Sequence, residues 1–532
     1  MTTNAGNPTP AYFPITGDSL VDGMTTGYVW ALDGSRTIDL ALADGFGGES
    51  WNFPDAVTTY LATAGSVVSY YADVRFNLSG YYANPSYAFS NGADITVSGD
   101  SSYNFFNSAS TWGLAFFPDS KYDSLVYRGA PGDIYINVAS AGNSLPSYEP
   151  GSNGWFLLLH EFGHALGLKH PHDDGGTGRP TFSNIGISSM DSQFGTVMSY
   201  NDSGDWNQYS WDPATPMILD VYALQYLYGK NNTTNAGNDS HTLTDDGYYV
   251  TLWDSSGTDT LDVASSSVAW TIKLPDISLS TLVDTRAGLA TPTRDFTVLV
   301  PQTIVWLAGD YENATGSRFG DSITGNLFNN VLKGNAGNDI IDGKTGTDIA
   351  VYNGSRSSYI ITKTPSEYIV RDDLGLDGTD TLINIERLAF SDKVVALDVS
   401  AADNAGKAKM FTGAIAHSLV NDAEALGFIL HFVDSGYSDL LSLSQLAIDA
   451  GLIATFAGSS SNQALAELVT TNVLGAEDLG VATMLTGYMD GTFASFSQAQ
   501  FLAAVAALEV NQQHVDLVGL AQTGMEYVPL GL

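Results

Sequence analysis

"GWFLLLHEFGHALGLKH", from Gly154 to His170, is the stretch that decides the fold of the N-terminal half, and it holds three of the chain's eight histidines. Its apolar residues recur at nearly every turn and no proline interrupts them, so the pattern predicts a buried helix over residues 154–168. His160 and His164 are four residues apart and therefore share one face of that helix. Gly167 is a natural helix end, because glycine accepts the left-handed backbone conformation that such an end requires.

A metal site can form where this predicted helix ends. Pro171 forbids further helix, so the chain can turn and bring His170 back to the first two histidines. Three neutral imidazoles with an open fourth position describe a catalytic zinc site, whereas four protein ligands describe a structural one. Glu161 lies one step round the helix, where its carboxylate reaches a water in the site without being a ligand. The alternative is a buried helix with hydrogen-bonded histidines, but chance produces the five fixed positions in only about 10⁻⁵ of chains of this length.

Two downstream segments extend the pattern: "FGTVMSYND" (194–202) and "PMILDVYALQYLYGKN" (216–231). Together with the histidine motif they resemble the metzincin metallopeptidases, in which a methionine turn follows the zinc helix. The second segment is similar to the helix after this turn in the serralysin branch, and the resemblance covers roughly residues 11–398. It implies a zinc-protease domain in which Met198 forms a hydrophobic floor beneath the zinc and Tyr200 lies beside the metal.

The resemblance also implies how the site works. Glu161 would take a proton from the attacking water and pass it to the leaving amine, and the Tyr200 hydroxyl would stabilise the oxyanion. The predicted strand at 132–140, which precedes the zinc helix, would border the cleft and pair with an extended substrate. Asn201 departs from the family, since many serralysins carry an aromatic residue there. His172 is expected to be a surface residue.

A nine-residue period begins at Gly316 and runs through four units: "GSRFGDSIT", "GNLFNNVLK", "GNAGNDIID" and "GKTGTDIAV". It predicts a calcium-binding parallel β-roll, in which each unit is a turn plus a short strand. Hard oxygen ligands in the turns suit Ca²⁺, whereas a Gly/Asp-rich loop without metal is the alternative. Side-chain ligands are predicted at position six, and buried side chains at position eight: Asp321, Asn330, Asp339 and Asp348, and Ile323, Leu332, Ile341 and Ala350. Ligands should pair between alternate units, Asp321 with Asp339 and Asn330 with Asp348.

Two further segments, "LWDSSGTDTLD" (252–262) and "DYENATG" (310–316), look like additional calcium loops of the serralysin β-roll. The resemblance implies side-chain ligands at Asp254, Asp259 and Glu312, and carbonyl ligands at Asn235, Gly237, Ser256, Gly257 and Asp310. Residues 377–397 resemble the strands that close such repeat regions, and we assign them no chemistry.

Composition narrows the function classes. A chain of 532 residues with 58 acidic and 20 basic residues has a net charge of −38, which argues against nucleic-acid or anionic-membrane partners. The absence of cysteine removes thiol chemistry. No apolar run is long enough to span a membrane, and the N-terminus shows no cleavable secretory signal. Leaderless proteins with such repeats are typically exported by type I secretion machinery, so the resemblance implies a bacterial extracellular protein that folds where calcium is abundant.

The C-terminal segment, residues 401–532, differs in composition. Lys409 is its last basic residue, and helical spacing of Ala and Leu predicts an α-helical domain. Nine residues between 420 and 450 recur at an offset of 53, which predicts two related helical units packed together. The segment resembles a helical domain of unknown function from secreted bacterial repeat proteins. Docking on an external partner and contact with the chain's own protease domain are equally open roles.

The predicted architecture is multidomain α+β. An N-terminal extension with a possible propeptide (1–19) precedes a metzincin zinc-protease domain (20–235), a parallel β-roll with closing strands (236–400) and a helical domain (401–532). The predicted function is a secreted, calcium-stabilised zinc endopeptidase that acts on protein or peptide substrates. The alternative is a non-catalytic calcium-binding surface or adhesion protein with an inert protease-like domain.

Overall fold

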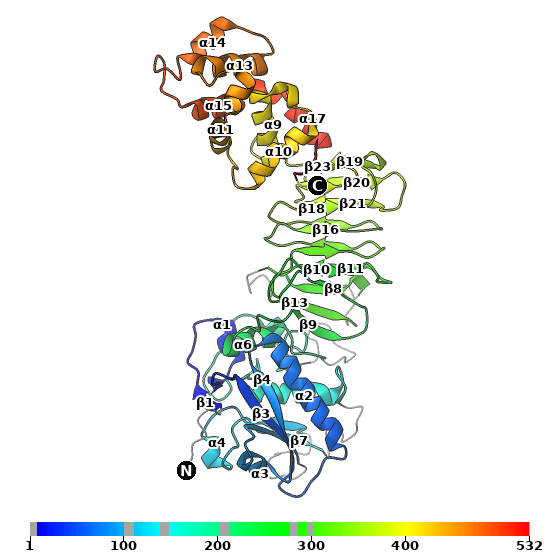
Figure 1. The fold of residues 1–532 in the computed structure, drawn as a ribbon. Helices are drawn as coiled ribbons and strands as arrows, with labels where there is room; N and C mark the ends of the chain where they lie inside the picture. The colour runs from blue at the N-terminus through cyan, green and yellow to red at the C-terminus, as the bar shows by residue number, and fades with distance from the viewer. Residues whose placement is uncertain are drawn as a thin grey trace. The chain divides into compact units, whose positions relative to one another are not determined.

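The computed structural model describes residues 8–100, 111–138, 148–201, 213–276, 286–294 and 302–530. Its contacts form two compact units, Met1–Asn313 and Ala314–Leu532 (Figure 1). The boundary between the units therefore falls inside the segment predicted as the roll, 236–400. In the part of the chain that is described, no helix is both long and apolar enough to cross a membrane.

The first unit combines a five-stranded sheet with three longer helices and a later group of strands. Its described strands are β1 (Thr9–Tyr12), β2 (Tyr28–Ala31), β3 (Thr37–Asp44), β4 (Arg75–Tyr82), β5 (Ile95–Asp100), β6 (Gly113–Ala115), β7 (Ile134–Asn137), β8 (Ser240–Thr242), β9 (Tyr249–Trp253), β10 (Thr260–Asp262), β11 (Trp270–Lys273), β12 (Leu289–Pro292) and β13 (Ile304–Ala308). Its described helices are α1 (Ser19–Met24), α2 (Pro54–Tyr71), α3 (Pro85–Ser90), α4 (Tyr122–Leu125), α5 (Asn153–Ala165), the 3₁₀ turn η2 (Ser188–Met190) and α6 (Ile218–Tyr228).

The five-stranded sheet has the order β4-β3-β5-β7-β6. Four of these strands are parallel, and β6 runs antiparallel to β7. β7 confirms the strand predicted at 132–140, but it has a strand on each side, so it has no free edge for a substrate. Among the described strands, β6 occupies that edge. The substrate-pairing role predicted for 132–140 is therefore wrong in its strand.

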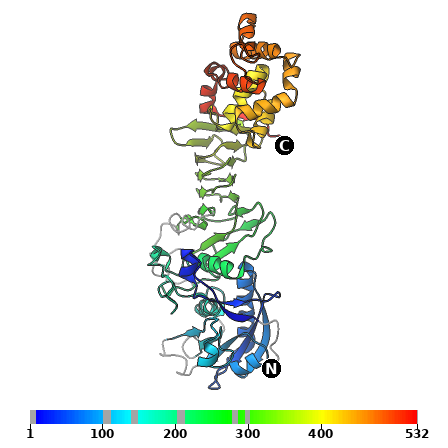
Figure 2. The same ribbon diagram turned by 90° about the vertical axis from the view of Figure 1, so that its left-hand side faces the viewer.

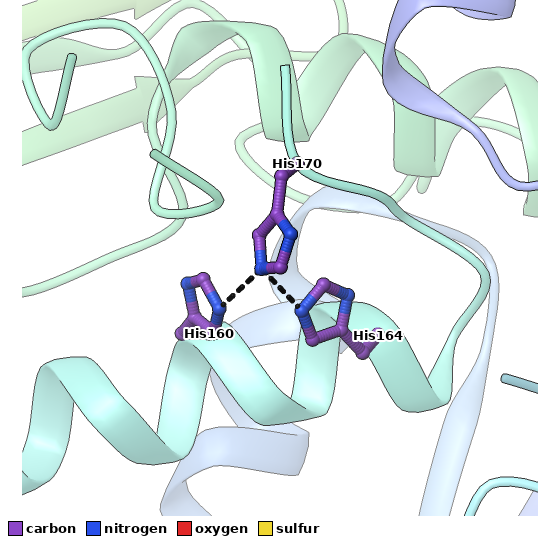
Figure 3. A group of neighbouring side chains, drawn as sticks. All are labelled: His160, His164 and His170. Atoms are coloured by element: carbon purple, nitrogen blue, oxygen red, sulfur yellow. Dashed lines mark hydrogen bonds between the residues drawn. The ribbon is translucent and has the colours of Figure 1, made fainter. Parts of the chain in front are cut away.

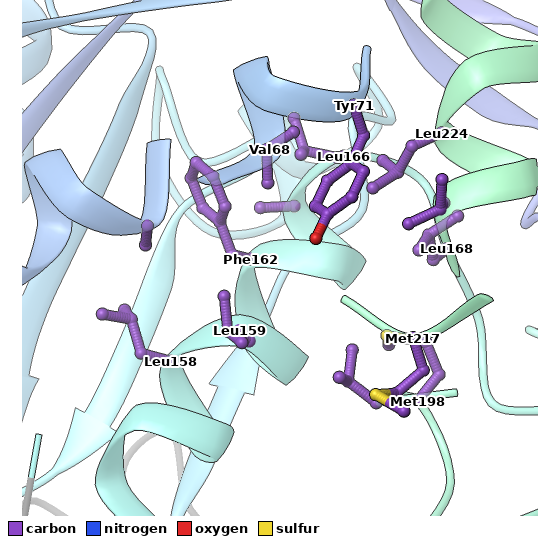
Figure 4. Close-up of a cluster of buried hydrophobic side chains, with 14 of the residues drawn as sticks. Val68, Tyr71, Leu158, Leu159, Phe162, Leu166, Leu168, Met198, Met217 and Leu224 are labelled. Atoms are coloured by element: carbon purple, nitrogen blue, oxygen red, sulfur yellow. The ribbon is translucent and has the colours of Figure 1, made fainter. Parts of the chain in front are cut away.

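The zinc-motif helix α5 is buried in the hydrophobic core of the first unit. α2 begins at Pro54, a first-turn position that proline favours, and its buried side chains follow helical spacing. Side chains of α2, α5 and α6 pack together with Met198 and Met217 (Figure 4). The helices predicted within 55–74, 154–168 and 216–231 are confirmed.

The N-terminal extension is ordered from residue 9 onward. β1 pairs antiparallel with β2, and Asp18 caps α1 by accepting hydrogen bonds from two backbone N–H groups. The buried Arg179 donates from Nη1 to Asp22 at 2.9 Å, which ties this segment to the body of the unit. Residues 9–19 of the predicted extension thus include β1 and the start of α1, whereas residues 1–7 lie outside the described residues. Cleavage of a propeptide remains a prediction.

The strands after residue 235 share the core of the first unit. β11, β12, β13 and β9 lie side by side in that order. Trp306 of β13 is fully buried, and its indole N–H donates to the carbonyl oxygen of Phe194 at 2.8 Å. These strands therefore belong with the zinc-motif helix, and the nonapeptide repeats begin the second unit.

The second unit contains short strands followed by helices. Its described strands after β14 (Asn313–Thr315) are β15 (Ser322–Thr324), β16 (Val331–Lys333), β17 (Ile340–Asp342), β18 (Ile349–Val351), β19 (Tyr359–Lys363), β20 (Tyr368–Asp372), β21 (Thr379–Ile383), β22 (Arg387–Ala389), β23 (Val394–Ala396) and β24 (Met525–Tyr527). Its described helices are α9 (Asn404–Ile415), α10 (Ala423–Asp434), α11 (Leu440–Asp449), α12 (Leu452–Ala457), α13 (Asn462–Leu474), α14 (Leu479–Thr486), α15 (Gln498–Ala506), α16 (Glu509–His514) and α17 (Leu517–Thr523), with 3₁₀ turns η4 (Arg356–Ser358) and η5 (His417–Leu419).

The repeats form the predicted parallel roll. β15 pairs with β17 and β17 with β21, while β16 pairs with β18 and β18 with β22, all in parallel. Alternate short strands of the repeats therefore stack above one another, in two separate sheets (Figure 2). The position-eight side chains Ile323, Leu332, Ile341 and Ala350 are all fully buried, as predicted.

The helices of 401–532 are held between two neighbouring strands. β23 leads into α9, and β24 returns after α17 to pair antiparallel with β23. At the start of β22, the buried Arg387 forms ion pairs with Asp398 and with Asp434 of α10. The helical domain is thus joined to the closing strands of the roll at both ends, a long-range pairing without a local sequence signal.

The helices repeat at a different offset from the predicted one. α9 and α13 begin at Asn404 and Asn462, and α11 and α15 begin at Leu440 and Gln498, each pair 58 positions apart. The predicted offset of 53 matches a buried serine inside α11 with the serine that caps α15. The spacing of these two helix pairs differs from the sequence offset of 53, and the predicted duplication remains a prediction.

Candidate functional site

The zinc-motif helix ends where the sequence predicts. Ser152 is the N-cap of α5 and accepts a hydrogen bond from the Trp155 N–H, and Leu166 is the C-cap of the helix. Gly167 has a φ of 99°, and a side chain there would overlap the carbonyl oxygen of Tyr28. Glycine is therefore required at this turn, which directs His170 back toward the helix.

Three imidazoles converge at the turn (Figure 3). The Nε2 atoms of His160 and His164 lie 3.2 and 2.9 Å from Nε2 of His170. In a tetrahedral site, zinc–nitrogen bonds of about 2.0–2.1 Å place ligand nitrogens roughly 3.3 Å apart. The three predicted ligands are thus brought together at a spacing that fits one zinc ion.

Each imidazole is oriented through its second nitrogen. Nδ1 of His160 lies 2.7 Å from the carbonyl oxygen of Val197, and Nδ1 of His164 lies 2.9 Å from that of Leu168. Nδ1 of His170 lies 2.7 Å from the Asp173 carboxylate. These acceptors favour the tautomer with its proton on Nδ1 and leave the Nε2 lone pairs available to a metal.

Burial keeps two of the imidazoles neutral. It lowers the pKa of His160 to about 3, with a further contribution from the charge of His170. Burial, and the charges of His160 and His170, also hold the pKa of His164 well below its usual value. The neutral imidazole is the form that binds metal, so the centre suits a cation at neutral pH.

Glu161 is buried beside the histidines. Its Oε2 has no hydrogen-bond partner among the described residues. Burial raises the pKa of this carboxyl to about 8. A Cβ added at Gly113 of β6 would lie 2.5 Å from its Oε1, so the edge strand passes directly beside the carboxylate. One oxygen of Glu161 is therefore without a hydrogen-bond partner among the described residues, and burial favours the protonated form of its carboxyl.

The methionine turn lies against α5. Met198 is fully buried, and a Cβ added at Gly163 would meet its sulfur at 2.5 Å. Asp220 of α6 accepts hydrogen bonds from the backbone N–H of Val197 and the hydroxyl of Thr196. The turn is thus fixed between two helices, and its Val197 carbonyl is the group that orients His160.

Tyr200 follows this turn and is 64% exposed. Its ring centroid lies 5.4 Å from that of His160 and 4.4 Å from that of His170. Burial, together with the negative charges of Glu161 and Asp173, raises the pKa of its hydroxyl to about 12. The hydroxyl therefore keeps its proton at neutral pH. His172, expected only to be a surface residue, also contacts this ring, at 5.1 Å.

A first acidic cluster lies in the strands after residue 235. Asp239, Asp254 and Asp259 place carboxylate oxygens within 4.8 Å of one another. The backbone N–H of Asp259 donates to Glu312 at 2.7 Å, and that of Ser256 donates to Asp254 at 3.2 Å.

The glycines of the predicted calcium loops meet at this cluster. A Cβ at Gly257 would overlap the carbonyl oxygen of Gly237 and would lie 2.7 Å from a carboxylate oxygen of Asp259. Burial raises the pKa of Glu312, and the negative charge of Asp310 contributes to this. The side-chain amide of Asn235 donates a hydrogen bond to the backbone carbonyl oxygen of Trp253. Its predicted role as a carbonyl ligand remains a prediction.

The position-six residues of the repeats form a ladder in the second unit. The backbone N–H of Asp321 donates to Asp339, and that of Asn330 donates to Asp348, both at 2.7 Å. The residues predicted to pair between alternate units therefore lie next to each other, and their role as calcium ligands remains a prediction. Burial is the main cause of the raised pKa values of Asp339, to about 8, and Asp348, to about 7.

Three carboxylates of these clusters each have a buried oxygen that can bind a cation. The second carboxylate oxygens of Asp259, Asp339 and Asp348 are buried and have no hydrogen-bond partner among the described residues. A buried oxygen of this kind is costly unless a cation or proton satisfies it. These donor sets fit Ca²⁺, which prefers carboxylate and carbonyl oxygens.

Sequence reasoning missed three members of these clusters. Asp239 ends an "NAGND" stretch (235–239) that recurs unchanged at 335–339, and this identity could have revealed it. Asp380 and Glu386 continue the ladder by accepting from the backbone N–H groups of Asp339 and Asp348, at 3.0 and 2.8 Å. The strand pair β19–β20 separates them from the repeats, so no nine-residue period reaches them. Residues 377–397, to which we assigned no chemistry, therefore contribute two carboxylates to the ladder.

Comparisons with known proteins identify the repeats and a group of relatives. Residues 315–350 match the RTX calcium-binding nonapeptide repeat in four copies. The chain is 38% identical to Serralysin C of Dickeya chrysanthemi over 141 residues, which are 23% of this chain and 29% of that protein. It is 36% identical to Serralysin of Proteus mirabilis over 143 residues, or 23% of this chain and 28% of that protein.

A third relative gives the longest of these matches. The chain is 32% identical to Serralysin B of Dickeya chrysanthemi over 181 residues, which are 30% of this chain and 37% of that protein. The chain thus spans less than two fifths of the length of the curated relatives named here. Within these limits the chain is serralysin-like and carries RTX calcium-binding repeats.

Proposed function

We propose that the first unit is a zinc endopeptidase. One observation carries this proposal: three converging imidazole nitrogens lie beside the buried carboxylate of Glu161, whose Oε2 has no hydrogen-bond partner among the described residues. A purely structural zinc site has four protein ligands and needs no adjacent base. The similarity to serralysins supports the same reaction.

The proposed residues divide the reaction between them. His160, His164 and His170 would hold zinc, which supplies Lewis acidity to the scissile carbonyl and lowers the pKa of a water when bound. Glu161 accepts a proton from that water as the water oxygen bonds to the carbonyl carbon. The same carboxyl then donates the proton to the departing amine nitrogen as the carbon–nitrogen bond breaks.

Tyr200 completes the proposed site. Its hydroxyl keeps its proton at neutral pH, because its pKa is raised to about 12. It can therefore donate a hydrogen bond to the oxygen that becomes negative in the tetrahedral intermediate. Met198 would support the site from beneath through its contact with α5.

The substrate is proposed to be an extended peptide. β6 is the edge strand of its sheet among the described strands, and its Gly113 lies against Glu161. A peptide added to that edge would form main-chain hydrogen bonds and pass beside the base. The substrate would therefore be recognised mainly through its backbone.

Calcium is proposed to stabilise the fold without taking part in the reaction. The predicted ligands and the three added carboxylates, Asp239, Asp380 and Glu386, would hold several Ca²⁺ ions. The match to RTX repeats supports this role and, with the serralysin similarity, an extracellular protein exported by type I machinery. Folding outside the cell would follow from the need for calcium.

The helical domain is proposed to be an accessory module, with outward docking and contact with the protease still equally open. Because β24 completes the sheet edge beside β23, deletion of 401–532 would also remove a strand of the roll. A variant that lacks only 404–521, with a short linker, keeps that pairing possible. Unchanged peptide cleavage with lost surface attachment would support docking, whereas altered cleavage would support control of the protease.

A peptide library tests the proposed function directly. The calcium-loaded protein should cleave library peptides, and a zinc-selective chelator should abolish cleavage that added zinc restores. Mass spectrometry of the products gives the bond positions. A zinc-loaded, folded protein that cleaves no peptide would favour the alternative, a calcium-binding surface or adhesion protein with an inert protease-like domain.

A further inference from the structure

Tyr200 is supported by one imidazole that the metal centre does not require. The tyrosine ring is 64% exposed and contacts three imidazole rings. Two belong to proposed zinc ligands, whereas the third belongs to His172. The three converging Nε2 atoms already form the ligand set, so His172 needs another explanation.

His172 is itself held in place. Its ring lies parallel to that of His170, at an angle of 6° and a centroid distance of 5.1 Å. Its Nδ1 lies 3.9 Å from a carboxylate oxygen of Asp191. The imidazole therefore fills the space between a proposed ligand, an acidic side chain and the ring of Tyr200.

Asp191 also fixes the chain on both sides of Tyr200. The Ser199 hydroxyl donates to the Asp191 carboxylate at 2.7 Å, and the Asn201 amide donates to the Asp191 carbonyl oxygen at 2.9 Å. The backbone N–H of Gln193 donates in turn to the Asn201 carbonyl at 3.0 Å. The asparagine that departs from the serralysin pattern thus has a role here, and it shares Asp191 with His172.

We propose that His172 is a positioning residue for Tyr200, and that Asp191 holds both the imidazole and the tyrosine segment. This inference rests on the proposed peptidase function. An exposed tyrosine must be confined to one orientation if its hydroxyl is to meet the oxyanion, and aromatic contacts on several sides provide that confinement. His172 would act through Tyr200 and would touch neither the zinc nor the substrate.

A double-mutant cycle separates this role from an effect on the zinc ligand. His172→Ala should lower kcat roughly tenfold with little change in KM, because a misplaced group loses mainly transition-state stabilisation. In a Tyr200→Phe background, the same change should have almost no further effect. An equal loss in both backgrounds would overturn the proposal, as would a wild-type kcat for His172→Ala.

Two matched variants sharpen the cycle. His172→Phe keeps an aromatic wall without the nitrogen near Asp191, and it should restore most of the activity that His172→Ala loses. Asp174→Asn changes a neighbouring exposed acid whose side chain accepts only from the Gly176 backbone among the described hydrogen bonds, and it should behave like wild type. Zinc content must be equal in all variants, since loss of zinc from His172→Ala would assign the residue to the metal site instead.

A spectroscopic readout tests the positioning without any catalysis. With 3-fluorotyrosine incorporated at position 200, the ¹⁹F resonance of the zinc-loaded protein should shift and change in width on His172→Ala, because the ring gains freedom. Asp174→Asn should leave the resonance unchanged. An unaltered resonance in His172→Ala would overturn the inference even if the protein cleaves no peptide, so its failure is distinguishable from failure of the proposed function.

Discussion

The zinc-motif centre brings imidazoles together, and the calcium ladder brings carboxyls together. Burial shifts the pKa values of these two kinds of group in opposite directions. Burial lowers the pKa of His160 to about 3, so the imidazole is neutral without metal. In the ladder, burial raises the pKa of Asp339 to about 8 and of Asp380 to about 7. These carboxyls can relieve crowding only by holding protons or binding cations.

The difference shows which site can form before its metal arrives. His160 and His164 are neutral without metal, and each of the three imidazoles has an acceptor for an Nδ1 proton. The carboxylates of the ladder have backbone N–H donors on one oxygen, but Asp339 and Asp348 each keep a buried second oxygen without a partner among the described residues. The proposed zinc centre should therefore be organised by the protein, and the proposed calcium sites of the roll by their ions.

The largest expected effect removes the chemistry and leaves both metal sites intact. Glu161→Ala should reduce peptide cleavage by about 10³-fold or more, since the general base is lost while the three imidazoles remain. Steady-state cleavage and zinc content measure the two parts of this prediction. Glu149→Ala, at an exposed glutamate shortly before α5, is the control and should keep full activity. Wild-type cleavage by Glu161→Ala would show that the base is assigned wrongly.

Calcium removal tests the dependence of the roll on its ions. A calcium-selective chelator at neutral pH should unfold the repeat strands of the second unit, from residue 314 to about 400, because no cation then offsets the charge of their buried carboxyls. Calcium added at about 100 times its dissociation constant should return roughly 2.7 kcal/mol per independent site. Hydrogen exchange would follow β15–β18, and calcium-independent protection there would refute the role of the ions. The imidazole centre of α5 has no corresponding need for calcium.

The pH dependence of the metal-free protein should differ in sign between the two groups. The raised pKa values of Asp339, Asp348 and Asp380 mean that the folded roll holds protons that the unfolded chain loses above about pH 4. Their contribution to stability is therefore present below about pH 4 and is lost as pH rises toward 8. Without calcium, the urea midpoint for the roll strands should rise on acidification within that window.

The histidines should show the reverse. His160 has a folded pKa of about 3, below the ordinary value, so its contribution is complete above about pH 6.5 and is lost as pH falls toward 3. Asp94 and Asp220 of the same unit have raised pKa values of about 7 and oppose this effect on overall stability. The His160 ring should therefore be followed directly by NMR. A ring titration near pH 6.5 in the folded, metal-free protein would contradict the comparison.

The same contrast explains how much the sequence could predict. The zinc helix and the repeats are local patterns with periods of 3.6 and nine residues, so α5, its end at Gly167 and the buried position-eight side chains all follow from neighbouring residues. The position of Asp321 next to Asp339 also follows from the period. Patterns of this kind need no knowledge of the rest of the fold.

Features that depend on distant pairing could not be predicted in this way. β6 has three residues and gains its edge position only from its partner β7. β24 returns to β23 after more than 100 residues of helix and loop, and Glu386 reaches the ladder only after the strand pair β19–β20. The contact of His172 with Tyr200 likewise needs the turn after α5 to meet the segment after the methionine turn.

The smallest expected effect concerns one amide within the ladder. Asn330 occupies the position that aspartate fills in the other three units, and its Oδ1 accepts from the Asn326 N–H at 2.9 Å while its Nδ2 donates to the Asn326 side chain at 3.0 Å. Asn330→Asp replaces that donor with a second carboxylate oxygen and adds a negative charge beside Asp348. Calcium affinity should then rise by a few-fold, because the site gains charge and an oxygen ligand. Stability without calcium should fall, because the new charge repels Asp348.

Asn329→Asp adds the same charge one residue earlier, on an exposed side chain, and should change neither quantity appreciably. Calcium titration by calorimetry and urea unfolding with chelator measure the two effects. Equal behaviour of the two variants would mean that net charge, and not the ladder position, controls calcium binding in the roll.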